Sequence, residues 1–324
     1  MIADVEVACT KVLSRPMKIA IASGKGGTGK TTVATNLAQV AATDGRAVAY
    51  LDCDVEEPNG YLFLKPTIQR QQSIDKLLPM VDLGRCTFCG RCSQACRYGA
   101  IACVGKQVLV FAELCHSCGG CVLACPADAL REVPKPIGEL RLGMAGPIRF
   151  IEGRLNVGEA MSPPAIRAVK AAVREKGTGT ICRNGPDGAS HKWCLSPFHS
   201  EADLTILDCP PGTSCPVIES IRGSDLVLLV TEPTPFGLHD LKLAVEMVRA
   251  LKLSLAVVLN RCDIGDDQVR QYCTSQRIAI LAEIADDRAV AEAYSRGQLA
   301  CAAVPSFAGH IRSLLSRLPN GAAR

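Results

Sequence analysis

Short apolar runs alternate along the chain with stretches in which apolar side chains recur every three or four positions. The apolar runs predict buried strands at 17–23, 46–52, 204–208, 225–230, 254–260 and 278–284. The helical spacing predicts helices at about 31–43, 163–177 and 238–252. Apolar strands separated by amphipathic helices indicate an α/β fold, with a mostly parallel sheet covered by helices on both faces.

A cysteine-rich segment interrupts this alternation. Cysteine and glycine replace the strand and helix patterns from residue 81 to about residue 133, and the stretch 133–143, which holds two prolines, predicts a linker. Because strands and helices resume afterwards, we expect a small inserted α+β domain at 81–133. The α/β domain then comprises 17–80 and 134–324, and residues 1–16 form an N-terminal extension, either disordered or an artefact of start-site choice.

Composition is that of a globular protein large enough for one α/β domain and a smaller module. The 324 residues are 48% hydrophobic and 21% charged, and no apolar run reaches the length of a membrane span. The N-terminal stretch is acidic where an export signal is basic, so we expect a cytoplasmic protein. The net charge of +4 without a basic cluster argues against a nucleic-acid partner. The 18 cysteines therefore indicate metal or redox chemistry rather than disulfides.

A glycine-rich loop joins the first strand to the first helix. It fits the pattern G-x-x-x-x-G-K-[ST] with Gly24, Lys25, Gly26, Gly27, Thr28, Gly29, Lys30 and Thr31, and Thr32 completes the predicted nucleotide-binding residues. Glycines let backbone N–H groups turn around phosphate oxygens at the start of a helix. We expect Lys30 to hold the β and γ phosphates of ATP and Thr31 to bind Mg²⁺. The alternative is a flexible glycine turn, which the flanking strand and helix disfavour.

Lys25 is not part of the generic loop pattern. Lys30 already serves the chain's own nucleotide, so a second cation is most useful across a subunit boundary, as an arginine finger is. The sequence GKGGTGKT resembles the signature of the deviant P-loop ATPases, which include MinD, ParA, the Mrp-type iron–sulfur carriers and the nitrogenase iron protein. In that family the early lysine contacts the nucleotide of the other protomer. The resemblance implies a nucleotide-gated homodimer, and the alternative is an incidental exposed lysine.

Other positions resemble the same family over most of residues 17–300. In LDCDVEEPN (51–59), Asp54 matches the aspartate that positions the attacking water, and Asp52 lies near the metal; the alternative is an ordinary acidic loop. The apolar strand in ILDCPPGTSCP ends at Asp208, which the resemblance makes the aspartate that supports Mg²⁺ through water. Asn260 matches the adenine-contacting asparagine, although asparagine at a strand end is also common in turns.

Two cysteine runs within 81–133 follow the pattern C-x2-C-x2-C-x3-C. Such a pair is typical of bacterial two-cluster ferredoxins, in which each fourth cysteine binds the other cluster. One 4Fe–4S cluster is therefore expected on Cys86, Cys89, Cys92 and Cys125, and a second on Cys115, Cys118, Cys121 and Cys96. Arg97 stands where proline is usual after the fourth cysteine. Structural zinc is the alternative. A zinc site needs only four cysteines in paired C-x2-C motifs, whereas these two runs contain eight.

The remaining ten cysteines are expected to be mostly small core residues. Cys215 lies seven residues after Asp208, the interval at which the nitrogenase iron protein carries a ligand to its bridging cluster, so a dimer-bridging role stands beside a structural one. Cys182, Cys194 and His191 fall in an aperiodic loop, 182–203, where a metal site or a thiol partner is an alternative that the lack of C-x2-C spacing disfavours. The C-terminal C-x-x-C of Mrp-type carriers is absent.

The C-terminal stretch 310–318 carries apolar residues on one helical face and arginines elsewhere. A membrane-binding tail of the MinD kind has this pattern. A helix that docks on the protein's own core has it too, and docking is the favoured interpretation.

Three functions fit these patterns. The first is an ATPase whose homodimer couples nucleotide turnover to electron transfer with a redox partner, or to cluster delivery to an apo iron–sulfur client. The second is a MinD- or ParA-like spatial organiser with the ferredoxin segment as a sensor. The third is an electron carrier with a vestigial nucleotide site, against which the intact Lys30, Thr31, Asp54 and Asp208 argue. A subset of the P-loop family carries such a ferredoxin insert, and residues 231–246 are similar to that subset.

Overall fold

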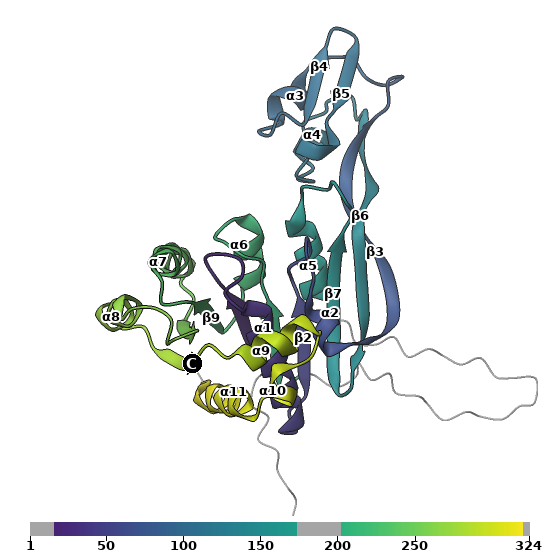
Figure 1. Ribbon diagram of the computed structural model, residues 1–324. Coiled ribbons are helices and arrows are strands. Elements are labelled where there is room, and N and C mark those ends of the chain that lie inside the picture. Colours follow the sequence, from purple (N-terminus) through teal and green to yellow (C-terminus); the bar gives the residue numbers. More distant parts are fainter. Residues whose placement is uncertain (1–15, 174–201, 320–324) are drawn as a thin grey trace, which may run out of the picture.

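A nine-stranded sheet forms the centre of the protein (Figure 1). The computed structural model describes residues 16–173 and 202–319. The strand order is β11-β10-β9-β1-β8-β2-β7-β6-β3. The strands are β1 (Met17–Ala22), β2 (Val48–Asp52), β3 (Thr67–Val81), β6 (Leu130–Ala145), β7 (Ile148–Leu155), β8 (Leu204–Asp208), β9 (Leu226–Thr231), β10 (Leu255–Asn260) and β11 (Ile280–Ile284). Pairing is parallel from β11 to β7 and antiparallel from β7 to β3, which confirms the mostly parallel α/β fold.

Helices cover both faces of this sheet. On one face lie α1 (Lys30–Thr43), α2 (Gly60–Leu64), α9 (Arg288–Ser295), α10 (Ala300–Ala303) and α11 (Pro305–Arg317). On the other lie α5 (Ser162–Ala172), α6 (Cys215–Ile221), α7 (Pro235–Ala250) and α8 (Gln268–Ser275). Successive residues of β1 enter opposite cores, Ile19 on the α1 face and Ala20 on the α5 face. This two-sided burial explains why the strands are apolar without alternation.

The predicted elements are found close to their expected positions. The six strands are β1, β2, β8, β9, β10 and β11, and the three helices are α1, α5 and α7. The last part of the helix expected at 163–177 lies outside the described residues, as does most of the loop expected at 182–203, with Cys182, His191 and Cys194.

The prediction of a linker at 133–143 is wrong. These residues belong to β6, which pairs along its whole length with β3. Pro134 and Pro136 fit because β7 pairs with β6 only from Gly138 onward. Before that point one edge of β6 has no neighbouring strand. Residues two apart in a strand direct their backbone N–H groups to the same edge, so two prolines, which lack this group, can face the free edge without loss of a hydrogen bond. We call the two-stranded part beyond β7, residues 74–81 and 130–138, the stalk.

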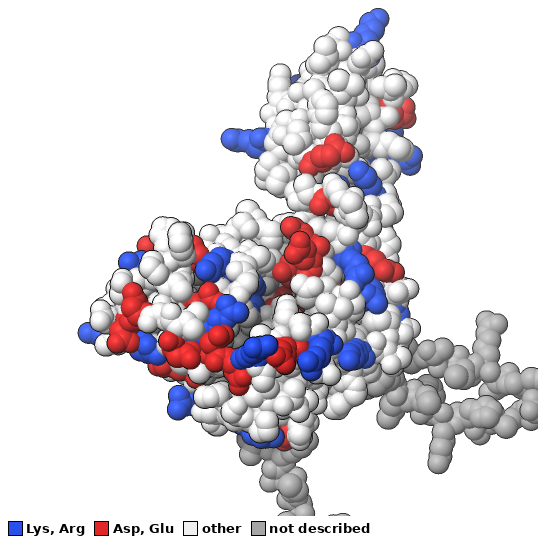
Figure 2. All heavy atoms as spheres, in the orientation of Figure 1, with Lys and Arg blue, Asp and Glu red and all other residues white. Residues whose placement is uncertain are grey.

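The cysteine-rich segment sits at the end of the stalk (Figure 1). It contains α3 (Arg91–Ala95), β4 (Ile101–Val104), β5 (Gln107–Val110), the 3₁₀ turn η1 (Ala112–Leu114) and α4 (Gly120–Leu123). We call residues 82–129 the insert. Figure 2 shows side chains of both charges gathered over the body of the protein, whereas the insert carries few of them in that view.

The C-terminal helix α11 docks on the protein's own core. Ile311, Leu314 and Leu315 are buried in the same cluster as residues of α1 and β11. The favoured interpretation of 310–318 is therefore confirmed, and the apolar face that a membrane-binding tail would present is already covered. None of the described helices is long and apolar enough to cross a lipid bilayer.

Candidate functional site

The glycine-rich loop lines a cavity of about 360 Å³ at the carboxyl end of β1. Gly27 and Gly29 adopt left-handed backbone angles, with φ of 79° and 92°, which only glycine takes without strain. The Asn260 amide donates to the Thr28 carbonyl oxygen at 2.9 Å and fixes the loop against β10. A Cβ on Gly29 would lie 2.6 Å from that amide nitrogen. A side chain from another strand thus fixes the conformation of the loop around its cavity.

Most of the predicted nucleotide-binding residues line this cavity. They are Gly26, Gly27, Gly29, Lys30, Thr31, Thr32 and Asn260, and the predicted catalytic residue Asp54 lines the cavity too. Gly24 approaches the backbone of Asp240 in α7 so closely that any side chain would clash. Thr28 is buried, and its hydroxyl has no hydrogen-bond partner among the described residues. A buried hydroxyl in that state is suited to a ligand that approaches the loop.

Two buried aspartates stand next to each other below the loop. Asp52 and Asp208 are partners in the register of β2 and β8. Asp52 accepts from the backbone nitrogen of Gly60 at 2.9 Å, and Asp208 accepts from the Tyr50 hydroxyl at 2.9 Å. Burial raises the pKa of both carboxyl groups, and for Asp208 the hydrogen bonds from Thr31 and Tyr50 and the charge of Lys30 oppose that rise.

Asp208 keeps one carboxylate oxygen for a ligand. Its Oδ1 atom is buried and has no hydrogen-bond partner among the described residues, whereas Oδ2 is bound by Tyr50. The Thr31 side chain, which lines the nucleotide cavity, opposes the rise that burial causes in the pKa of this carboxyl group and so lies close to it. Oxygen donors in this arrangement fit a hydrated Mg²⁺ ion.

Asp54 lies at the cavity itself, two residues beyond the end of β2. Burial, followed by the nearby charge of Asp208, raises the pKa of Asp54 to about 7. Its backbone nitrogen donates to Asp52 Oδ1 at 3.2 Å, which fixes the start of the loop. A carboxyl group with such a pKa, beside a phosphate-binding loop, can exchange protons near neutral pH.

Lys25 is directed to a neighbouring carboxylate. Its ammonium lies 3.7 Å from Glu232 Oε2, and a third of its side chain is exposed. Glu232 also pairs with Arg261 at 3.0 Å. Lys25 does not figure among the described residues that line the 360 Å³ cavity, whereas Lys30 does. The two lysines of the loop therefore have different surroundings.

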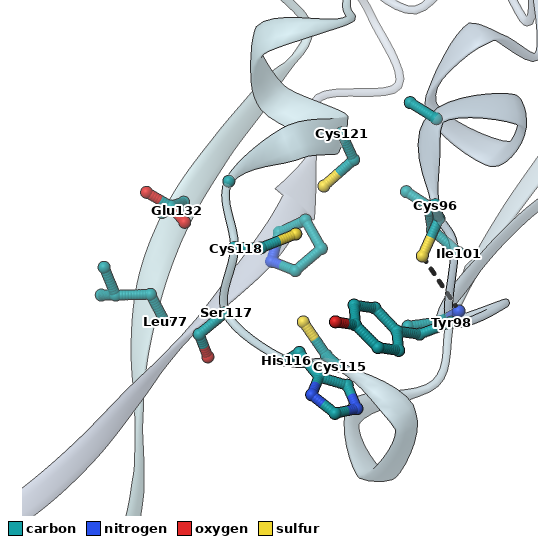
Figure 3. A pocket seen from close by; sticks show the side chains of 14 residues that line it. Leu77, Cys96, Tyr98, Ile101, Cys115, His116, Ser117, Cys118, Cys121 and Glu132 are labelled. Atoms are coloured by element: carbon teal, nitrogen blue, oxygen red, sulfur yellow. Dashed lines mark hydrogen bonds between the residues drawn. The ribbon is translucent and has the colours of Figure 1, made fainter. Parts of the chain in front are cut away.

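The insert holds two cavities, each lined by four of the cysteines in the repeated pattern. Cys96, Cys115, Cys118 and Cys121 line the first, and Figure 3 shows their sulfur atoms facing one common space. Cys86, Cys89, Cys92 and Cys125 line the second. The structure thus brings together the same two sets of four, with the fourth cysteine of each run exchanged.

The two cysteine runs have the same local backbone. Phe88 and Ser117, each two residues after the first cysteine of its run, have φ of 55° and 53°. Left-handed glycines follow at Gly90 and Gly119. A left-handed non-glycine residue is strained and persists where the surroundings require it. This repeated geometry bends each run around its cavity.

Backbone N–H groups point at the cysteine sulfurs. Ala100 N lies 3.3 Å from Cys96 Sγ, and Ala129 N lies 3.3 Å from Cys125 Sγ, in equivalent places of the two runs. Donors of this kind stabilise thiolates and tune the potentials of iron–sulfur clusters. Among the described residues no three His, Cys, Asp or Glu side chains converge closely enough for a single metal ion. The thiolates of a 4Fe–4S cube bind four different iron atoms and are spaced accordingly.

Two features of the insert were not predicted from the sequence. Cys103, in β4, lines the second cavity as a fifth thiol, and its charge raises the pKa of Cys92 after the larger effect of burial. No spacing signal marks it, because it lies outside both runs. Beside the first cavity, the rings of Tyr98 and His116 stack with centroids 3.6 Å apart (Figure 3).

Polar contacts connect the base of the stalk to the loop after β2. Lys76, in β3, donates to Glu159 Oε1, which also accepts from the backbone nitrogen of Met161. The next residue, Ser162, donates from its hydroxyl to the carboxylate of Glu56, two residues after Asp54. The stalk and the nucleotide cavity are therefore joined through the start of α5. Cys215, by contrast, begins α6 as an exposed thiol.

Comparison with known proteins gives a consistent picture. Residues 19–300 match the CobQ/CobB/MinD/ParA nucleotide-binding domain. The uncharacterized protein MJ0579 of Methanocaldococcus jannaschii is 28% identical over 88% of this chain and 92% of its own length. An iron-sulfur cluster carrier protein of Synechocystis is 58% identical over 13% of this chain and 12% of its own length. The septum site-determining protein MinD of Pyrococcus horikoshii, complexed with Mg-ADP, shares the fold with a TM-score of 0.54 and 18% identity, covering 93% of this chain and 94% of that one.

Proposed function

Because this chain belongs to the CobQ/CobB/MinD/ParA family of nucleotide-binding domains, we propose that it is an iron–sulfur ATPase. Two copies bind ATP between them, and the nucleotide cycle is coupled to electron transfer through two 4Fe–4S clusters in each insert. The observation that carries this proposal is the pairing of two cavities, each lined by four cysteines, with a phosphate-binding loop in one chain.

The nucleotide half of the proposal rests on the residues around the 360 Å³ cavity. Lys30 and the loop N–H groups bind the phosphates. Thr31 and the free Oδ1 of Asp208 fit Mg²⁺, which when bound neutralises phosphate charge. Asp54, with its raised pKa, orients the attacking water. Tyr50 holds Asp208 in place by its hydrogen bond.

The homodimer is supported by the position of Lys25. Its ammonium rests on Glu232 rather than in the cavity of its own chain. A partly exposed cation held by a weak ion pair can exchange that partner for a phosphate of a second chain at low cost. Lys25 then acts in trans, and hydrolysis requires two chains.

Cluster binding is supported by the donor set of each cavity. Cys92 and Cys115 are buried, one in each cavity, and backbone N–H groups stabilise the thiolates of Cys96 and Cys125. Four protein ligands for each cube favour clusters that stay in place and exchange electrons. When bound, the clusters supply one-electron chemistry, while the chain provides ligands, hydrogen bonds and partial exclusion of water.

Apolar side chains on the insert are available to a redox partner. Leu123 is 89% exposed, next to the run that lines the first cavity, and Tyr98 is about half exposed beside Cys96. Exposed apolar residues in a sparsely charged surface are typical of sites that bind another protein. The partner in this proposal is an electron donor or acceptor protein.

The decisive experiment combines three measurements on protein purified without oxygen. Iron and sulfide analysis should give about eight atoms of each per chain. Mg-ATP hydrolysis should require a dimer in which both chains carry their clusters. The rate of hydrolysis should change when the clusters are reduced by dithionite. A colourless, iron-free protein after reconstitution would remove the cluster half. If labelled iron instead passes to an apo-ferredoxin during turnover, the function is cluster delivery.

A further inference from the structure

A further cavity lies on the sheet face opposite α1. Its volume is about 550 Å³, larger than that of the nucleotide cavity. The walls come from α5, from the end of α6 and from the central strands β1, β2 and β8. Small-molecule sites in proteins have volumes of about 300–1,000 Å³. The cavity has the size of such a site and shares no residue with the nucleotide cavity.

The rim of this cavity is strongly cationic. Lys18, Arg167, Lys170 and Arg222 line it, and Glu219 is the one carboxylate among the described residues that do so. Glu219 pairs with Arg167 at 3.4 Å, and the Lys170 ammonium donates to the carbonyl oxygens of Glu219 and Arg222. Neither Lys18 nor Arg222 has an ion pair through its side chain in the part of the chain described. Within the described residues, two cations of the rim thus remain free of an ion pair.

An unpartnered hydroxyl and neighbouring positive charges in the wall indicate that an anion binds here. Ser224 is more than nine-tenths buried, lines the cavity, and has a hydroxyl with no hydrogen-bond partner among the described residues. Burial lowers the pKa of Lys170, and the positive charge of Lys18 adds a smaller decrease, although Cys53, Glu219 and Cys209 oppose both. An anion between these groups would satisfy the hydroxyl and offset the repulsion between the lysines.

The floor of the cavity is apolar. Ala171 and Val173 contribute its exposed apolar surface, and Leu51 and Leu207, almost fully buried in the core, close it from below. A purely inorganic anion would leave this surface wet, whereas an organic anion with a hydrocarbon or aromatic part would cover it. The arrangement of cationic rim, orphaned hydroxyl and apolar floor thus defines the chemistry of the ligand.

We propose that this cavity binds a small organic anion, whose carboxylate or phosphate group meets Lys18, Arg222 and Ser224 and whose apolar part lies on Ala171 and Val173. The site is separate from the nucleotide cavity and does not depend on ATP hydrolysis or on the clusters. Leu51 and Leu207 directly precede Asp52 and Asp208, so the cavity lies on the two strands that carry the buried aspartates.

The test uses the full chain with Mg-ADP in excess, so that the nucleotide cavity is filled. The fluorescent anion 8-anilinonaphthalene-1-sulfonate should bind saturably, and decanoate, phenyl phosphate or both should displace it. Decanoate alone as competitor identifies a carboxylate ligand, and phenyl phosphate alone identifies an organic phosphate. Removal of one charge-assisted hydrogen bond, in Lys18→Gln or Arg222→Gln, should weaken binding about tenfold.

Arg312→Gln is the matched control, because Arg312 is an exposed arginine on α11 at the opposite face of the sheet. It should bind the probe as the unchanged chain does. Arg222 is also exposed, so its replacement leaves folding intact. The proposal is overturned if no saturable binding is seen, if both cavity variants bind like the control, or if inorganic phosphate displaces the probe as well as decanoate and phenyl phosphate do.

Discussion

The ammonium of Lys76 lies 2.6 Å from the carboxylate of Glu159, and its side chain is fully buried although β3 is the edge strand of the sheet. This ion pair lies at the base of the stalk and continues through Met161 and Ser162 to Glu56. These contacts connect the insert-bearing hairpin to the loop that contains Asp54.

Breaking this pair should destabilise the protein strongly. Lys76→Met leaves Glu159 nearly buried without its partner, and Glu159→Gln leaves Lys76 as an unpaired buried cation. Each change should lower the free energy of unfolding by about 3–5 kcal/mol. The double variant Lys76→Met/Glu159→Gln should lose less than the sum, which denaturant unfolding of the three variants measures. Additive losses would show that the two residues are not coupled.

The crossed cysteine sets can be separated by single substitutions. Cys125→Ala should remove the cluster begun by Cys86, and Cys96→Ala should remove the other, so that iron falls from about eight to about four atoms per chain in each case. Electron paramagnetic resonance of the reduced protein identifies which cluster remains. Cys103→Ser, which changes a thiol that lines a cavity but lies outside both runs, is the matched control and should retain both signals. Loss of the Cys115 cluster in Cys125→Ala would contradict the assignment.

Lys25→Ala should abolish ATP-dependent association while leaving nucleotide binding intact. A trans-acting cation in phosphoryl transfer contributes a factor of about 10³ or more, so we expect turnover to fall by at least roughly 100-fold. The Kd for Mg-ADP should change less than about twofold, because Lys25 does not line its own cavity. Sedimentation with and without a non-hydrolysable ATP analogue follows dimer formation. Lys252→Ala, at an exposed lysine that follows the C-terminal end of α7, controls for loss of charge.

Asp54 should make the stability of the nucleotide-free protein depend on pH. Its folded pKa of about 7 exceeds the unfolded value near 3.9, so the folded state binds the proton more tightly. The stabilisation is complete below the unfolded pKa and is lost as the pH rises through about 7. Relative to Asp54→Asn, the unchanged chain should lose about 1–2 kcal/mol of unfolding free energy between pH 5 and 8.

The measurement is denaturant unfolding in EDTA, without nucleotide, at several pH values. Asp44→Asn, at an exposed carboxylate that follows α1, provides the comparison for a general change in charge. If the difference between Asp54→Asn and the unchanged chain is the same at every pH, the carboxyl group does not titrate in this range.

The parallel part of the fold could be predicted because its strands are buried on both faces. Residues such as Ile19 and Leu207 give continuous apolar runs that periodicity detects. The β3–β6–β7 end could not, since TIQRQQSIDKLLPMV is an edge strand with most of its side chains exposed. Its pairing with β6 is long-range. Pro134 and Pro136 are typical of a linker, and no sequence signal indicates that β7 does not extend along β6 as far as these two residues.

The candidate site shows the same division. Cysteine spacing predicted which four cysteines share a cavity, because the two runs follow the two-cluster ferredoxin pattern, in which the fourth cysteines are exchanged. Contacts that depend on tertiary placement were missed, among them Lys25 with Glu232 and Cys103 beside Cys92. Asn260 was expected near adenine, and the structure adds its hydrogen bond to the loop at Thr28.

The stalk gives the protein a lever arm. Eight residues of β3 beyond β7 extend for about 26 Å at roughly 3.3 Å per residue. A tilt of about 10° at the base would sweep the tip through about 4–5 Å over that length. If the insert carries clusters as proposed, such a movement would control their distance from a redox partner, and because tunnelling rates fall steeply with distance, a small rearrangement around a phosphate group would switch electron transfer on or off.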